Sequence, residues 1–108
     1  MNWIEKIQKC FRSDSVFYTG HAKFEMKNEE FGRIFEYEVY EAVCNGEVIE
    51  EYPEDKPYPS VLILGRTKVG RILHVVCAYN EKETLTIVIT AYQPDSELWI
   101  DYRRRKKP

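Results

Sequence analysis

The chain of 108 residues contains little glycine, three cysteines, two histidines and no long apolar run. No apolar run approaches the ~20 residues that a membrane-spanning helix needs, and the N-terminus lacks the apolar segment of a signal peptide. We therefore expect no membrane association and a cytoplasmic location in a bacterium. Hydrophobic residues still make up 44% of the chain, which is enough for the core of one globular domain over residues 1–108.

The cysteines and histidines do not form a recognisable metal or disulfide pattern. Cys10, Cys44 and Cys77 are widely separated, no Cys-x-x-Cys pair is present, and His21 lies far from His74. This spacing disfavours a zinc site and, still more, a disulfide framework, so we expect buried, reduced cysteines. No glycine-rich phosphate loop follows an expected strand, so we expect neither a nucleotide-dependent enzyme nor another cofactor.

The charge is unevenly distributed along the chain. The net charge is −2, and the run from Arg103 to Lys107 contributes five positive charges, so the rest of the chain carries −7. An acidic body is not a broadly basic nucleic-acid binder, and any contact with RNA must be local. Because neighbouring like charges repel each other and bury nothing apolar, residues 103–108 are expected to form a mobile basic tail.

Helical periodicity marks the first part of the chain. Residues 3–12 carry an apolar stripe at helical spacing, and Asn2 is a suitable N-cap. A second helix is expected over about residues 21–30 and a third over about residues 37–44. The third helix ends at Asn45-Gly46, where left-handed backbone costs little.

After Gly46 the apolar residues follow the spacing that is typical of β-strands. Beta-branched and apolar residues predict strands at residues 47–52, 60–66, 71–79 and 84–92. Short connections make these strands antiparallel neighbours, and residues 97–102 are expected to form a helical turn. Helices followed by a meander predict an α+β fold, with the helices packed on one face of a mostly antiparallel sheet.

His74 lies inside the apolar segment Leu73-His74-Val75-Val76. Such a histidine is commonly structural, with both nitrogens hydrogen-bonded, but on an open sheet face it would be a general acid or base. A two-residue turn at Glu81-Lys82 would place it opposite Ile89 on the apolar face. A loop one residue longer would place it opposite Val88 beside polar threonines, and the sequence leaves both registers open.

Other candidates surround this segment. Arg66, Lys68 and Arg71 cluster at one hairpin, as either a solvated turn or a phosphate clamp. Tyr92 ends the polar stripe of the last strand, where a phenol meets a phosphate, stacks on a base or packs at the surface. His21 begins a helix whose positive end disfavours the protonated imidazole, so it is either a neutral base or a residue bonded to a nearby loop.

An acidic edge follows the third expected helix. These carboxylates keep an edge strand soluble or meet a basic protein partner. The edge comprises Glu47, Glu50, Glu51, Glu54 and Asp55.

Several short motifs follow one another in a specific order between about Tyr18 and Arg105. They are His21-Ala22, Glu38-Val39, Ala42-Val43, Asn45-Gly46-Glu47, Ile49-Glu50-Glu51-Tyr52-Pro53, Pro59-Ser60, Leu64-Gly65, Leu73-His74-Val75-Val76, Tyr92-Gln93-Pro94-Asp95 and Trp99. In this combination the chain resembles a bacterial domain-of-unknown-function family, family 4258. That family often shows arginine in the helix after His21-Ala22, where this chain has Glu25.

Members of that family resemble small RelE-like and MqsR-like toxins, which are often encoded beside an antitoxin with zinc-finger and helix-turn-helix patterns. Such toxins cut messenger RNA without metal, because the ribose 2′-hydroxyl attacks the adjacent phosphate and leaves a cyclic phosphate. The reaction needs a base, an acid and positive charge near the phosphate. The resemblance therefore implies a RelE-like fold, an antitoxin partner and an RNA substrate.

The residues that the resemblance and their chemistry favour fall into two groups. The catalytic candidates are His74, Arg66 and Tyr92, with His21 in reserve. The RNA-binding candidates are Lys68, Arg71, Arg103, Arg104 and Arg105. Two alternatives stay open: a non-catalytic protein-interaction module of the same fold, and an RNA-binding protein without catalysis.

Overall fold

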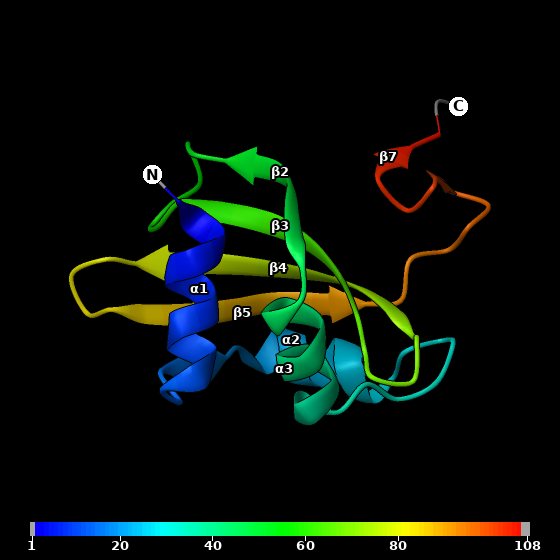
Figure 1. Ribbon diagram of the computed structural model, residues 1–108, viewed down its shortest axis with the longest axis horizontal. Coiled ribbons are helices and arrows are strands. Elements are labelled where there is room, and N and C mark those ends of the chain that lie inside the picture. The colour runs from blue at the N-terminus through cyan, green and yellow to red at the C-terminus, as the bar shows by residue number, and fades with distance from the viewer. Residues whose placement is uncertain (1, 107–108) are drawn as a thin grey trace.

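The computed structural model describes residues 2–106 and confirms the α+β fold. Figure 1 shows the long strands side by side, with α1 crossing in front of them and the C-terminal segment leaving the sheet at the end of β5. The helices are α1 (Trp3–Arg12), α2 (Gly20–Lys27) and α3 (Glu36–Cys44). The strands are β1 (Val16–Tyr18), β2 (Glu47–Tyr52), β3 (Ser60–Arg66), β4 (Ile72–Asn80), β5 (Leu85–Tyr92), β6 (Trp99–Ile100) and β7 (Arg104–Arg105).

Local capping sets the helix limits. The Asn2 side chain accepts a hydrogen bond from the Glu5 backbone N–H at the start of α1, as the sequence predicts. Thr19 does the same for Ala22 at the start of α2, over 2.9 Å. This helix ends at Lys27, earlier than expected, because the chain turns back and the Ile34 N–H bonds to the Met26 carbonyl.

The five-stranded sheet has the order β1-β5-β4-β3-β2. Strands β2 to β5 form the antiparallel meander that their short connections predict. Strand β1, which was not expected from the sequence, pairs with β5 in parallel at one edge. No helix within residues 2–106 has the length and apolar character needed to cross a bilayer.

A β-bulge in β5 decides which side chains share a face. Val76 lies opposite Thr90, whereas Cys77 lies opposite Val88, so Ile89 is an extra residue in β5. Both registers considered for His74 are therefore wrong, and His74 lies opposite Tyr92. The bulge reverses the alternation within β5, so that Thr86, before the bulge, faces the core and Thr90, after it, faces the opposite side of the sheet.

The core lies between the helices and one face of the sheet. Ile7 and Val39 from the helices pack with Val61, Leu73 and Val75 from the strands, and all five are fully buried. We call the opposite face of the sheet, which carries His74 and Tyr92, the open face. Helix α3 lies so close to β3 that a Cβ atom on Gly65 would collide with the Ala42 backbone. Only glycine fits this close approach.

Residues 99–105 form a second, separate ribbon, which we call the C-terminal hairpin. Strands β6 and β7 pair antiparallel, with Trp99 opposite Arg105. The helical turn expected over residues 97–102 is limited to its start, where the Leu98 and Trp99 N–H groups bond to the Asp95 carbonyl. It is wrong from Trp99 onward, because Trp99 and Ile100 pair with Arg105 and Arg104, and Trp99 is buried against the open face. Mobility of residues 103–108 stays a prediction, and Lys107 and Pro108 lie outside the described residues.

Candidate functional site

The structure brings two predicted site residues together. His74 in β4 and Tyr92 in β5 are opposite each other on the open face. Nδ1 of His74 lies 3.2 Å from the Tyr92 hydroxyl, and the two rings meet edge to face with centroids 5.3 Å apart. A histidine and a phenol in hydrogen-bond contact form a pair that can exchange a proton.

The second ring nitrogen of His74 fixes the tautomer of the imidazole. Nε2 lies 2.6 Å from the backbone carbonyl oxygen of Tyr102. Because a carbonyl oxygen only accepts hydrogen bonds, Nε2 carries the proton and donates, and Nδ1 accepts from the Tyr92 hydroxyl. Burial lowers the pKa of His74 below its ordinary value, so the imidazole is neutral at pH 7.

The C-terminal hairpin covers this pair. The indole ring of Trp99 packs edge to face on the His74 ring, with centroids 4.5 Å apart. Arg105 in turn lies over the Trp99 ring, with its guanidinium carbon 5.3 Å from the ring centroid. His74 is fully buried in this arrangement although α1, α2 and α3 pack on the other face of the sheet.

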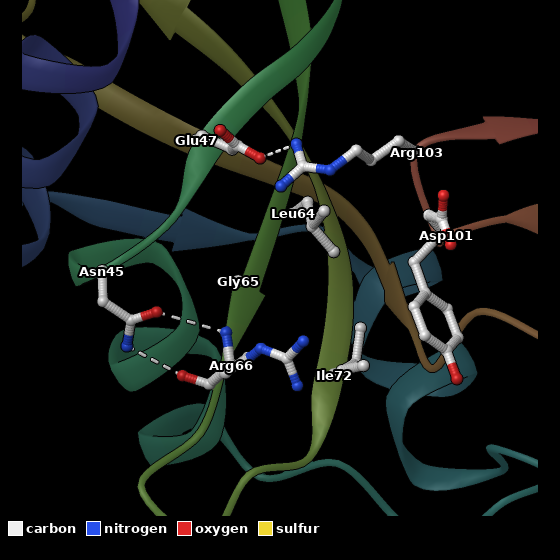
Figure 2. Close-up of a pocket in the computed structure, with 9 residues that line it drawn as sticks. Asn45, Glu47, Leu64, Gly65, Arg66, Ile72, Asp101 and Arg103 are labelled. Atoms are coloured by element: carbon white, nitrogen blue, oxygen red, sulfur yellow. Dashed lines mark hydrogen bonds and ion pairs between the residues drawn. The ribbon is translucent and has the colours of Figure 1, made fainter.

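An open cavity of about 520 Å³ lies between Arg66 at the end of β3, Ile72 at the start of β4 and the turn of the C-terminal hairpin. Neither His74 nor Tyr92 lines it, but Tyr102, whose carbonyl bonds to His74, does. Its charged and polar lining includes Arg66, Glu47, Asn45 and Arg103. Figure 2 shows the Arg66 side chain extending from the strand end toward Ile72, while Arg103 reaches across to Glu47. Two arginines and two carboxylates, Glu47 and Asp101, thus face this cavity, and of the two arginines Arg103 is already paired with Glu47.

Arg66 is held by its backbone. The Asn45 side chain accepts from the Arg66 N–H over 3.2 Å and donates to the Arg66 carbonyl over 2.8 Å. Among residues 2–106, the guanidinium of Arg66 forms no ion pair. Asn45, which the sequence suggested only as a helix end, therefore positions an arginine whose charge is available to a ligand.

Arg71, by contrast, is bound within the protein. Its guanidinium nitrogens donate to the Gln93 side chain over 2.8 Å, to the carbonyls of Gly32 and Arg33, and to Glu38, whose nearer oxygen is 3.2 Å away. These contacts hold the segment between α2 and α3 against the sheet. They do not place Arg71 with the His74 group.

The remaining candidates from the sequence are exposed on other elements of the fold. Lys68 is exposed in the β3–β4 turn, and Arg104 is exposed on β7. His21 is exposed in the first turn of α2, which packs on the helix-covered side of the sheet. The structure therefore does not bring His21 to the His74–Tyr92 pair.

Two contacts of the site have no signature in the sequence. One is the Tyr102 carbonyl at His74, because any residue supplies a carbonyl. The other is the Trp99 ring on the imidazole, which requires the C-terminal segment to fold back. Within residues 2–106, no group of three His, Cys, Asp or Glu side chains is placed to hold a metal ion.

Comparison with known families gives one match. A family model described as "Domain of unknown function (DUF4258)" matches residues 18–93. The match covers most of the chain and both members of the His74–Tyr92 pair, and it ends before the C-terminal hairpin begins. No curated protein and no solved structure matches the chain.

Proposed function

The chain belongs to the DUF4258 family, and we propose that it is a metal-independent ribonuclease whose site is the His74–Tyr92 pair on the open face. The observation that carries the proposal is the 3.2 Å contact between the neutral imidazole and the phenol. Arg66, opposite Ile72 at the end of the neighbouring strand β3, supplies positive charge in this proposal. These are the base, the acid and the charge that cleavage through a 2′-hydroxyl requires.

The pair acts as a proton relay in this proposal. The relay needs the tautomer of His74 with the proton on Nδ1, which forms once the Tyr102 carbonyl no longer accepts from Nε2. Nε2 then takes the proton of the ribose 2′-hydroxyl as the bond from O2′ to phosphorus forms. The bond from phosphorus to O5′ breaks, and the leaving oxygen takes the Tyr92 hydroxyl proton, which the Nδ1–H of His74 replaces. Arg66 stabilises the negative charge that develops on the phosphate oxygens. The products are a 2′,3′-cyclic phosphate and a free 5′-hydroxyl.

RNA contacts outside the relay come from the cations around the cavity. Lys68 lies in the turn beyond Arg66, Arg103 lines the other side of the cavity, and Arg104 and Arg105 follow it, exposed on β7. In the proposal these residues hold the phosphates next to the cleaved one, which makes binding depend on salt. The wider assignment to a RelE-like toxin, with an antitoxin encoded beside it, is part of the same proposal.

A cleavage assay in the presence of a chelator tests the activity. We expect His74→Ala, Arg66→Ala and Tyr92→Phe each to slow cleavage of a labelled RNA by about 10²-fold or more. Arg12→Ala and Tyr37→Phe are matched controls, because both residues are exposed on the helix side, and they should leave the rate unchanged. A product without a cyclic phosphate, or a rate indifferent to all three site variants, contradicts the proposal.

A protein-interaction module of the same fold is the second candidate, and a separate surface favours it. Several large aromatic side chains are exposed around α2 and α3, namely Phe24, Phe31, Phe35, Tyr37 and Tyr40. Arg33 stacks on Phe35 with 4.8 Å between the guanidinium carbon and the ring centroid. Aromatic residues and arginine are enriched at protein interfaces.

Co-purification distinguishes the module from the enzyme. If this surface binds the protein encoded by the adjacent gene, Phe35→Ser should abolish co-purification while His74→Ala leaves it intact. Binding of RNA without any cleavage would instead favour a non-catalytic RNA-binding protein.

A further inference from the structure

The C-terminal hairpin occupies the place that a substrate would need. The Tyr102 carbonyl accepts the only N–H of the neutral His74 ring, and Trp99 covers the ring from the side. We propose that the hairpin is a latch that keeps the site inactive and that opens when polyanionic RNA binds its arginines. This inference rests on the proposed ribonuclease function for its purpose, but its geometry can be tested separately.

The latched state is inactive for a chemical reason as well as a steric one. A base must present an unprotonated nitrogen to the 2′-hydroxyl. While Tyr102 accepts from Nε2, that nitrogen is protonated, and the lone pair lies on Nδ1, facing Tyr92. Departure of the Tyr102 carbonyl allows the proton to move to Nδ1, where it donates to the Tyr92 hydroxyl. The lone pair then lies on Nε2, toward the space that the hairpin has left.

The latch is held by few contacts. Strands β6 and β7 have two residues each, and so short a ribbon is not stable by itself. Its ion pair joins Arg103 to Glu47, whose side chains are 55% and 51% exposed. An exposed pair contributes little to stability and is weakened by salt, so a phosphate can replace Glu47 as the partner of Arg103.

The turn of the hairpin stores strain. Asp101 and Tyr102 have φ values of 52° and 62°, and the Arg103 N–H bonds to the Ile100 carbonyl over 2.9 Å. Two successive left-handed residues are typical of a type I′ turn, which favours Asn-Gly. Tyrosine in this region is uncommon and costs free energy. The strained residue is the one whose carbonyl reaches His74, so opening the latch relieves the strain.

RNA is the ligand that the charges of the latch favour. Arg103, Arg104, Arg105 and Lys106 follow one another in or beside the hairpin, and their like charges repel each other in the closed ribbon. Phosphates neutralise this repulsion and compete with Glu47. The hairpin also lies outside the matched family region, which ends at residue 93.

Nuclear magnetic resonance of the His74 ring tests the latch on the full chain. Trp99→Ala should open it, so that the ring loses its protected Nε2–H signal and its pKa rises toward about 6.5. The paired change D101N/Y102G supplies the Asn-Gly preferred by this turn and should close it further, slowing exchange of the Nε2–H by about tenfold or more. The Trp3 indole signal reports whether the core stays folded.

A nucleic-acid titration tests the trigger. A 2′-O-methyl RNA oligonucleotide cannot be cleaved through its 2′-oxygen, so it reports opening without reaction. Added to the wild-type protein, it should shift the His74 signals toward those of the Trp99→Ala variant. Inorganic phosphate at equal total charge should have a much smaller effect, because it cannot contact several arginines at once.

The outcomes separate the latch from the enzyme. A His74 ring that stays protected in a folded Trp99→Ala variant overturns the latch, and so does an oligonucleotide that binds without moving the His74 signals. If both signals respond as expected but Trp99→Ala leaves RNA whole, the latch stands and the ribonuclease proposal fails. Faster cleavage by Trp99→Ala than by wild type, with slower cleavage by D101N/Y102G, supports both.

Discussion

The two faces of the sheet are built in different ways. The helix-covered face is filled by apolar side chains from the three helices and from strands β3, β4 and β5, and residues such as Ile7, Val61 and Val75 are fully buried there. The open face carries His74, Tyr92 and Glu50, and at His74 it is covered by a hairpin of seven residues. One face therefore has a continuous core, whereas the other has a small polar cluster under a ribbon.

This difference teaches which face can change without unfolding the molecule. Apolar burial on the helix-covered face stabilises the fold as a whole. The hairpin makes few contacts, so it can open locally at a much smaller cost than global unfolding. A site on the open face can thus be exposed or masked while the scaffold stays intact.

The largest expected effect comes from a substitution on the helix-covered face, at the point where α3 lies closest to β3. Gly65→Ala introduces a Cβ that would collide with the Ala42 backbone, so α3 must move away from β3. Because the added Cβ would meet backbone atoms, no side chain can rotate to relieve the collision. We expect a loss of about 3 kcal/mol or more in the free energy of unfolding. Urea denaturation measures it.

Gly20→Ala is the matched control. Gly20 is the first residue of α2, and nothing lies within 4 Å of a Cβ placed there. Alanine restricts the unfolded chain and suits a helix, so this variant should be neutral or slightly more stable. Equal losses for both variants would mean that α3 does not pack on β3 as described.

The next prediction compares two arginines. Arg71 bonds to Glu38 with only 17% of its side chain exposed, whereas Arg103 bonds to Glu47 with 55% exposed. Arg71→Ala leaves a largely buried carboxylate without its partner, and we expect a loss of about 2–4 kcal/mol in unfolding free energy. Arg103→Ala should cost about 1 kcal/mol or less. A reversed order in thermal or urea denaturation would contradict the contrast between the two pairs.

The helix-covered face was the easier one to predict from the sequence. The limits predicted for α1, β2 and β3 match the structure, because strong periodicity and capping or turn residues mark their ends. Strand β1 escaped prediction because its three residues show no periodicity. Its pairing with β5 depends on a partner about 70 residues away in the sequence.

The site was predicted in part. The sequence suggested His74 and Tyr92 as partners, and the structure places them in contact. It could not reveal the bulge at Ile89, which decides the face, because a bulge arises from the pairing of two strands. It also could not reveal the latch, because the Tyr102 carbonyl has no side-chain identity and the hairpin needs the sheet to pack on.

The third prediction concerns pH and the open face alone. Burial lowers the pKa of His74, so the unfolded or opened state binds more protons than the latched state. The neutral His74 ring therefore stabilises the latched state fully above about pH 6.5, and this stabilisation declines as the pH falls below that value. Glu50 from β2 favours the protonated ring and Arg105 from β7 opposes it.

Hydrogen exchange of the hairpin amides measures this opening. Between pH 7.5 and pH 5.5, we expect protection of the hairpin, corrected for intrinsic exchange, to decrease while protection of the core strands changes less. In Trp99→Ala, where His74 is already exposed, the decrease should be absent. A hairpin whose corrected protection is constant across this range would contradict the assigned neutral state.

The smallest expected effect comes from removing single threonine hydroxyl groups on the two faces of the sheet. Thr86 faces the core because of the bulge, is fully buried, and its hydroxyl has no hydrogen-bond partner among residues 2–106. Valine has nearly the same shape without the hydroxyl, so Thr86→Val removes an unsatisfied polar group. We expect a gain of about 1 kcal/mol in unfolding free energy, or roughly 4 °C in Tm.

Two other threonines give this last prediction its contrast. Thr67 is also buried, but its hydroxyl accepts from the Arg71 N–H over 3.0 Å, so Thr67→Val should lose about 1 kcal/mol. Thr90 lies on the open face, beyond the bulge, and Thr90→Val should change stability by less than about 0.5 kcal/mol. If Thr90→Val stabilises and Thr86→Val does not, the two residues face the opposite way. The bulge would then be misplaced, and the His74–Tyr92 contact that depends on it would be lost.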